Sequence, residues 1–189
     1  MFKILTIIFA LLSLGFSQEN FKSIHQIELD YNKANFLEPS YKPKTSPAAP
    51  IQYRDQDPSI IVFGYHPYWQ GTKWQNYDYD VLTTIAYFSA EANGSGELTN
   101  LHGWPVTELI NKAHSHGVEV VLTVSLFNKT DLETLLSSST NRNNLIKNLI
   151  YEVQRGGADG VNLDFEVFPA SQKANLVTFV KSLRSSLRD

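Results

Sequence analysis

Short runs of apolar residues, many of them β-branched, recur along the last two thirds of the chain. Each run has the length of one strand, and together they cover residues 60–65, 82–89, 118–125 and 161–167. Unbroken apolar runs of this kind are typical of strands that are buried on both faces, as in parallel sheets. The pattern therefore predicts four interior strands.

Segments in which apolar residues recur with helical spacing lie between and after these runs. They cover residues 106–113, 131–136, 145–153 and 176–187. Gly117 follows the first of them and Gly156 follows the third, at positions where helices commonly end. Residues 70–80 are aromatic and polar, and we expect a loop there. Strands that alternate with helices in this way predict an α/β fold with a parallel sheet.

Residues 1–17 have the features of a secretory signal peptide. Lys3 provides the positive charge that precedes an apolar run. Gly15 and Ser17 are the small residues expected for cleavage before Gln18. A membrane anchor is the alternative, but spanning a bilayer takes roughly 20 apolar residues. We therefore expect a secreted, periplasmic or cell-envelope protein, with no membrane partner after the signal peptide is removed.

Residues 18–58 hold five of the eight prolines and show little hydrophobic periodicity. We expect a lead-in at residues 18–37, with room for one short helix, and an extended linker at residues 38–58. The part of the chain that can bury a core is then a single domain at residues 59–189.

Charge and composition exclude several classes of function. The chain has 16 basic and 19 acidic residues and no strongly basic stretch, which argues against nucleic acid as a partner. It has no cysteine, so disulfides, cysteine-bound metals and thiol catalysis are excluded. His114 and His116 are two positions apart on a predicted helix and do not face each other. We expect both in solvent and predict no metal site.

The last apolar run contains the candidate chemistry and reads D-G-V-N-L-D-F-E at residues 159–166. Side chains alternate along a strand, so Asn162, Asp164 and Glu166 are expected on one face, toward its C-terminal end. Active sites of parallel α/β folds are built at that end. Two neighbouring carboxyls raise the pKa of one of them, which suits a general acid at neutral pH. An ion-paired structural cluster is the alternative interpretation.

This motif resembles the signature of glycoside hydrolase family 18, the chitinase-like family, usually written D-G-x-D-x-D-x-E. The chain departs from that signature at Asn162 and matches it at Asp159, Gly160, Asp164 and Glu166. The form with asparagine is similar to that of spore-cortex and peptidoglycan N-acetylglucosaminidases. The resemblance covers about residues 59–189 and implies the first half, about four βα units, of a TIM (β/α)8 barrel.

The resemblance also implies a role for each residue of the motif. Glu166 would protonate the glycosidic oxygen while the substrate's own 2-acetamido carbonyl attacks the anomeric carbon, which is the substrate-assisted retaining mechanism. Asp164 would orient the acetamido group and stabilise the charged intermediate, and Asn162 would hydrogen-bond Asp164. Asp159 and Gly160 would have a structural role at the entry of the strand. No metal or organic cofactor is implied.

Aromatic residues gather at the ends of the first two predicted strands. By the same resemblance, the candidates for binding sugar rings are Tyr65, Tyr68, Trp69 and Phe88. Packing in the core or at the mouth of a barrel explains such aromatic residues equally well.

A (β/α)8 barrel usually takes about 250 residues, and its active site draws on loops from all eight strands. We therefore expect this chain to be the N-terminal half of a longer protein, with an incomplete site. The predicted function is a secreted glycosidase that cleaves β-1,4-linked N-acetylglucosamine polymers, either chitin or peptidoglycan. Two alternatives stay open: a chitinase-like lectin that binds carbohydrate without catalysis, and an unrelated doubly wound domain with a chance acidic strand.

Overall fold

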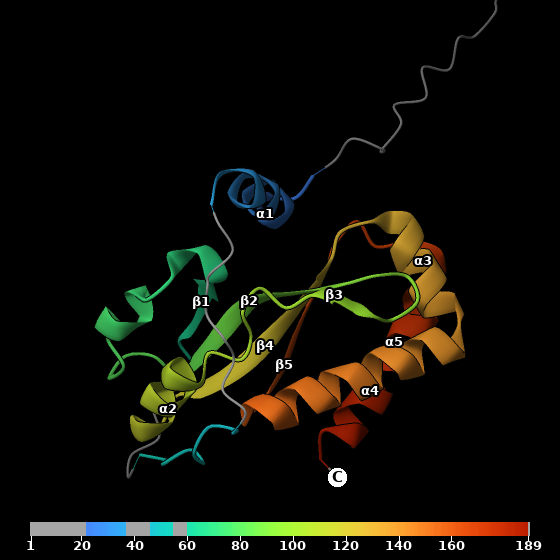
Figure 1. Cartoon of the computed structure of the whole chain (residues 1–189). Coiled ribbons are helices and arrows are strands. Elements are labelled where there is room, and N and C mark those ends of the chain that lie inside the picture. Colours follow the sequence, from blue (N-terminus) through green and yellow to red (C-terminus); the bar gives the residue numbers. More distant parts are fainter. Residues whose placement is uncertain (1–21, 37–45, 55–59, 189) are drawn as a thin grey trace, which may run out of the picture.

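The computed structural model describes residues 22–36, 46–54 and 60–188 (Figure 1). At its centre lie four parallel strands in the order β1-β2-β4-β5, and a short strand, β3, pairs antiparallel with β2. The strands are β1 (Phe63–Pro67), β2 (Thr84–Ala92), β3 (Leu98–Asn100), β4 (Glu119–Leu126) and β5 (Gly160–Phe165). The parallel strands follow one another in chain order, as consecutive βα units do in the wall of a barrel.

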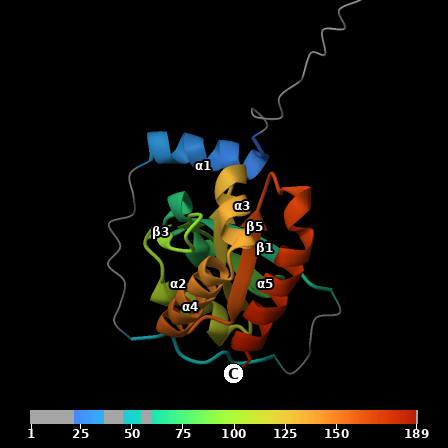
Figure 2. The ribbon, with the colours of Figure 1, turned by 90° about the vertical axis from the view of Figure 1, so that its right-hand side faces the viewer.

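Helices connect the parallel strands and pack beside the sheet (Figure 2). The α-helices are α1 (Ile24–Asn35), α2 (Thr107–Ser115), α3 (Lys129–Ser137), α4 (Ser139–Gly156) and α5 (Lys173–Ser186). The 3₁₀ helices are η2 (Tyr68–Gln70), η3 (Lys73–Asn76) and η4 (Ala170–Gln172). One buried cluster joins Leu132 of α3, Leu149 of α4 and Phe179 of α5 to Val124 of β4. The parallel α/β fold predicted from the alternating pattern is therefore confirmed.

The first two strands differ in extent from the sequence prediction. The ladder between β1 and β2 starts at the pair Phe63–Thr84. Ile60 and Ile61 therefore lie outside the sheet, and their exposed fractions are 69% and 81%. The second strand continues past residue 89 to Ala92 and turns back as β3. We did not predict β3, because its three residues form no apolar run.

Residues 70–80, which we expected as a loop, form a packed crossover between β1 and β2. They include η3, and both Trp74 and Tyr79 are buried in the core. The hydroxyl of Tyr79 donates a hydrogen bond to the carbonyl oxygen of Trp74 at 2.8 Å. Aromatic side chains thus fill space that a crossover helix covers elsewhere in the sheet.

The segment before the domain packs against it at two opposite ends. Helix α1 begins after Ser23, whose hydroxyl accepts the N–H of Gln26 at 3.0 Å, and it lies across one end of the sheet in both views (Figure 1, Figure 2). Residues 46–54 lie at the other end. There the Arg54 guanidinium donates to the carbonyl oxygens of Tyr79, Asp80, Leu82 and His116.

Part of the predicted N-terminal organisation lies outside the described residues. This holds for the signal peptide at residues 1–17 and for residues 18–21, 37–45 and 55–59 of the lead-in and linker. In the part of the chain that the structure describes, none of the helices combines the length and the apolar character needed to cross a bilayer.

A buried histidine makes the stability of the fold depend on pH. His66 in β1 is 1% exposed, and burial lowers its pKa from 6.5 to about 4. The unfolded chain therefore binds the proton more readily, so the free energy of unfolding falls as the pH drops from 6.5 to 4. The slope from this group is about 1.4 kcal/mol per pH unit. Urea unfolding at several pH values gives the free energy of unfolding as a function of pH. We expect this slope in the wild type and not in His66→Gln. Equal slopes in the two proteins would contradict the lowered pKa of His66.

The loop between β2 and β3 contacts α4 too closely to accept a side chain. Gly96 has φ +80°, and a Cβ there would clash with the carbonyl oxygen of Asn141 and lie 2.8 Å from the amide nitrogen of Leu145. We expect Gly96→Ala to lower the free energy of unfolding by at least about 2 kcal/mol. Gly160→Ala is the control: Gly160 has no positive φ, and a Cβ there would lie 3.5 Å from Cγ1 of Val121, an ordinary contact distance, so the substitution should cost less than about 1 kcal/mol. Equal losses in denaturant unfolding would refute the close approach.

Candidate active site

The two carboxylates of the motif lie together at the C-terminal end of β5. Asp164 is on the strand, in register with Ser125 of β4, and its exposed fraction is 9%. Glu166 follows the end of the strand, and its N–H donates to the carbonyl oxygen of Leu126 at 3.3 Å. The parallel ladder thus holds the backbone of both residues at the edge where α1 crosses the sheet (Figure 1).

A histidine from α1 completes this cluster. The Nδ1 atom of His25 lies 3.0 Å and 3.2 Å from the two carboxylate oxygens of Asp164 and 3.4 Å from Oε1 of Glu166. The sequence analysis missed His25, because 139 positions separate it from Asp164 and no local pattern marks it. Only the position of α1 brings it to the end of β5.

The environment raises the pKa of both carboxyls. Burial raises the pKa of Asp164, and the hydrogen bond from His25 opposes this rise. Burial also raises the pKa of Glu166, and the neighbouring charge of Asp164 raises it further. Oε2 of Glu166 is buried and has no hydrogen-bond partner among the described residues. A carboxyl with a raised pKa and a free oxygen can deliver a proton to a bound oxygen atom.

Asn162 does not make its expected contact. Its amide donates to the hydroxyl of Tyr65 at 3.2 Å and to Oγ1 of Thr123 at 3.3 Å, so the predicted hydrogen bond to Asp164 is wrong. The carboxylate of Asp164 is instead bound by His25. Asn162 thereby ties β5 to β1 across the inner face of the sheet.

Asp159 lies at the other end of the strand from the carboxylate pair. Its Oδ2 accepts the N–H of Val120 at 2.6 Å and lies 2.9 Å from Nε2 of His114. His114 is 2% exposed, so the expectation that it faces solvent is wrong, whereas His116 is exposed. The side chain of His114 turns inward because both of its ring nitrogens have partners, Asp159 and the carbonyl oxygen of Ala49.

The four candidate aromatic residues divide into two groups. Tyr65 and Phe88 lie edge-on to each other and to the ring of His25, with centroid distances of 5.4–6.0 Å, and Trp69 contacts Phe88. Tyr68 is 2% exposed and stacks flat on His102 at 4.0 Å. Tyr68 is therefore a core residue in this structure. The other three form a chain of ring contacts that starts at His25, and Phe88 in this chain is itself buried, with 4% exposed.

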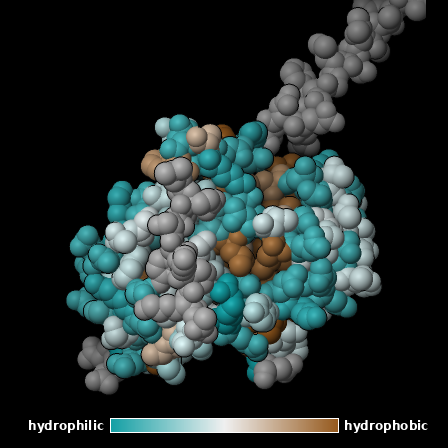
Figure 3. Space-filling view, viewed as in Figure 1, coloured by the Kyte–Doolittle hydropathy of each residue, from teal (hydrophilic) through white to brown (hydrophobic). Residues whose placement is uncertain are grey.

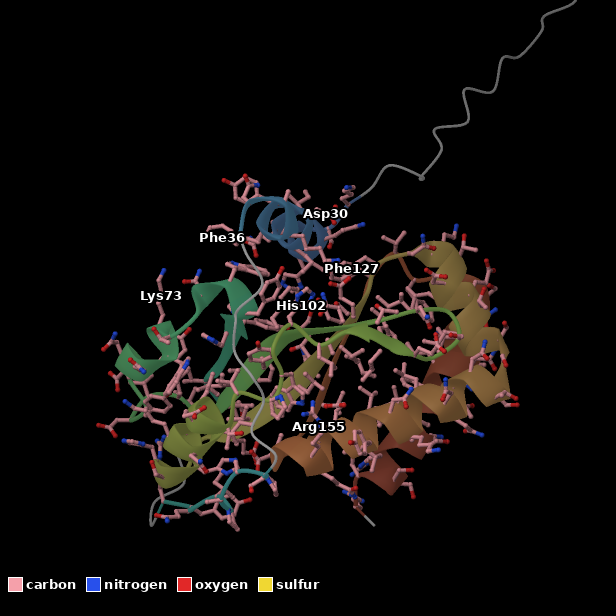
Figure 4. All side chains as sticks on the ribbon, in the orientation of Figure 1. Asp30, Phe36, Lys73, His102, Phe127 and Arg155 are labelled. Atoms are coloured by element: carbon pink, nitrogen blue, oxygen red, sulfur yellow. The ribbon has the colours of Figure 1, made fainter. Side chains whose placement is uncertain are left out.

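The face of the molecule seen in Figure 3 is largely hydrophilic, and it has a hydrophobic patch near the centre of the view, in the region of β3 and α4. Phe127 lies beneath α1 in Figure 4, and His102 lies nearby toward the middle of the sheet. Both follow strands or loops at the end of the sheet that α1 covers.

The cluster also has the donors for a metal ion. His25, Asp164 and Glu166 each offer one ligand atom, and these atoms lie within 4.8 Å of one another. Imidazole and carboxylate donors suit Zn²⁺. The hydrogen bond between His25 and Asp164 already pairs two of these three groups, so a metal ion is not needed to explain why they lie together.

Consecutive parallel βα units with a carboxyl pair at the C-terminal end of a strand are the arrangement found in part of a (β/α)8 barrel, a fold that many glycosidases share. The family model described as glycosyl hydrolases family 18 matches residues 61–189, and the chain belongs to this family. No curated protein matches the chain.

Solved structures share the fold over part of their length. A chitinase from Bacteroides thetaiotaomicron has a TM-score of 0.57 and 22% identity, covering 65% of this chain and 42% of its own. The spore cortex-lytic enzyme SleL from Bacillus cereus has a TM-score of 0.58 and 18% identity, and the match covers 68% of this chain and 32% of SleL. The chitinase RmChi1 from Rhizomucor miehei has a TM-score of 0.55 and 26% identity, and the match covers 66% of this chain and 43% of RmChi1. This chain thus spans less than half of each structure, in agreement with a partial TIM-barrel fold.

The coupling between the two carboxyls is measurable. We expect carbon-13 NMR titration to find the pKa of Glu166 above 4.5, and Asp164→Asn to lower it, because the substitution removes the neighbouring negative charge. Glu97 is the internal reference: hydrogen bonds from Asn93 and Ser95 lower its pKa, and it should not respond. An unchanged pKa of Glu166 in Asp164→Asn would show that the two groups are not coupled.

Proposed function

We propose that the protein is a glycoside hydrolase that cleaves β-1,4-linked N-acetylglucosamine polymers, chitin or peptidoglycan, with retention of configuration. The observation that carries the proposal is the pair Asp164 and Glu166 at the end of β5, in which burial and the charge of Asp164 raise the pKa of Glu166. Membership of the family supports the same reaction class.

In the proposed reaction, Glu166 donates its proton to the glycosidic oxygen as the bond to the anomeric carbon breaks. The carbonyl oxygen of the substrate's acetamido group forms the new bond to that carbon, giving a cyclic oxazolinium ion. The carboxylate of Asp164 accepts the acetamido N–H and stabilises the positive charge. Glu166 then takes a proton from the water that opens the ring, and this restores both groups.

Sugar contacts are proposed for the aromatic residues near the pair. Tyr65 is 41% exposed and its hydroxyl accepts the amide of Asn162, so its ring is held beside the carboxylates with one part accessible. Trp69 is partly exposed and packs against Phe88, which is 4% exposed and also contacts Tyr65 and His25. Rings of this kind bind the apolar faces of sugars by burying area at low cost in side-chain entropy.

The proposal extends to the whole protein. Because the chain spans less than half of the solved structures, we propose that it acts as the first half of a longer barrel whose remaining strands complete the saccharide site. We also propose that residues 1–17 direct the protein out of the cytoplasm. Outside the cytoplasm the protein would meet polymers of N-acetylglucosamine.

The acid role of Glu166 is tested by Glu166→Gln in the full-length protein. The amide cannot donate the proton, so turnover of chitin oligosaccharides or peptidoglycan strands should fall by about 10²–10⁴-fold with the fold intact. Glu133→Gln is the matched control, since Glu133 is an exposed glutamate on α3 and should keep wild-type turnover.

Retained hydrolysis in Glu166→Gln would overturn the assignment of the acid. Binding of the same saccharides by the wild type without product release would instead favour the lectin-like alternative. Circular dichroism of each variant separates a loss of chemistry from a loss of fold.

A further inference from the structure

Helix α1 covers the carboxylate pair, and its contacts coincide with those that a saccharide would use. We propose that α1 is an intramolecular ligand of the saccharide site and that saccharide must displace it. The inference rests on the proposed function, because it takes the end of β5 to be the sugar-binding surface.

His25 fills the polar and the apolar part of the site at once. Its Nδ1 lies 3.0 Å from Oδ2 of Asp164, the carboxylate proposed to accept the acetamido N–H of the substrate. Its ring lies edge-on to Tyr65 at 5.4 Å and to Phe88 at 5.6 Å, the aromatic residues proposed to contact sugar. A saccharide cannot bind these three groups while the imidazole lies between them.

A second ionic contact holds the other end of the helix. Lys33 pairs with Glu91, which also bonds to His102. Burial acts to raise the pKa of Glu91, but the hydrogen bonds from His102 and Lys33 outweigh it and lower the pKa. Glu91 is therefore ionised at neutral pH and suited to hold a lysine.

The contacts form one continuous helix face. His25, Leu29 and Lys33 are spaced four residues apart, so their side chains lie above one another on the same side. Leu29 between the two polar contacts is 3% exposed, and Asn32 beside it is 7% exposed. Because β2 and β5 provide the acidic partners, the face spans the end of the sheet (Figure 2).

The opposite side of α1 has no such role and provides the control. Tyr31 is 62% exposed, and Lys22 forms an exposed ion pair with Asp30 on the helix. Replacing Lys22 and Tyr31 removes a charge and a large side chain from the same segment, as does replacing His25 and Lys33. It leaves unchanged the helix face formed by His25, Leu29 and Lys33.

The test uses the full-length protein and a fully acetylated chitin trimer as the probe. Amide hydrogen exchange of residues 24–35 measures how firmly α1 is docked, first without the trimer and then with it. Calorimetry gives the Kd of the trimer. We expect the trimer to speed exchange in α1. If α1 occupies the site nine-tenths of the time, His25→Ala/Lys33→Ala should bind about tenfold more tightly, while Lys22→Ala/Tyr31→Ala should match the wild type.

A second variant separates docking from a direct effect on the carboxylates. Leu29→Ser weakens the face without removing a group near Asp164, and it should also tighten binding. Equal Kd values in the wild type and both face variants, with exchange of α1 unchanged by the trimer, would overturn the inference while the proposed function stands. Absence of trimer binding in every folded variant would overturn both.

Discussion

The parallel pairing of β5 with β4 determines where the two carboxyls of the site, Asp164 and Glu166, lie. The register places Asp164 opposite Ser125, whose hydroxyl is 2.9 Å from that of Ser89 on β2. The bond from the N–H of Glu166 to Leu126 continues the contact one residue beyond the strand. A shift of one residue would turn the carboxylates to the other face of the sheet. The leucine-rich helices that pack over β4 and β5 stabilise this register from outside.

Placing a buried carboxylate, Asp164, next to the partly buried Glu166 has an electrostatic cost that the structure meets with a partner from a distant segment. An unpaired charge in a buried position is strongly unfavourable. Here burial and the neighbouring charge of Asp164 raise the pKa of Glu166, while a hydrogen bond from His25 opposes the rise that burial causes in the pKa of Asp164. A site prepared to bind a charged intermediate is therefore also a site that attracts a basic side chain of its own chain. The same property would serve catalysis and self-occupation.

The edges of the described sheet agree with the partial coverage of the solved structures. β1 and β5 each pair on one side only among the described strands. Phe63 and Tyr65 on β1 are 45% and 41% exposed, and Val177 on α5 is 47% exposed. Unpaired strand edges with exposed apolar side chains are a hazard for association, and closure of a barrel removes them. The residues proposed to contact sugar lie next to one of these edges.

The sequence by itself determined the parallel α/β fold, the approximate positions of the strands and helices, and the carboxyl pair at the C-terminal end of β5. These features are local, because strand and helix periodicities and the spacing of Asp164 and Glu166 arise within short segments. Tertiary structure alone decided the burial of Tyr68 and His114, the partners of Asn162, the short strand β3 and the placement of His25. Each of these depends on which distant segments meet, and apolar periodicity carries no information about the partner of a single polar side chain.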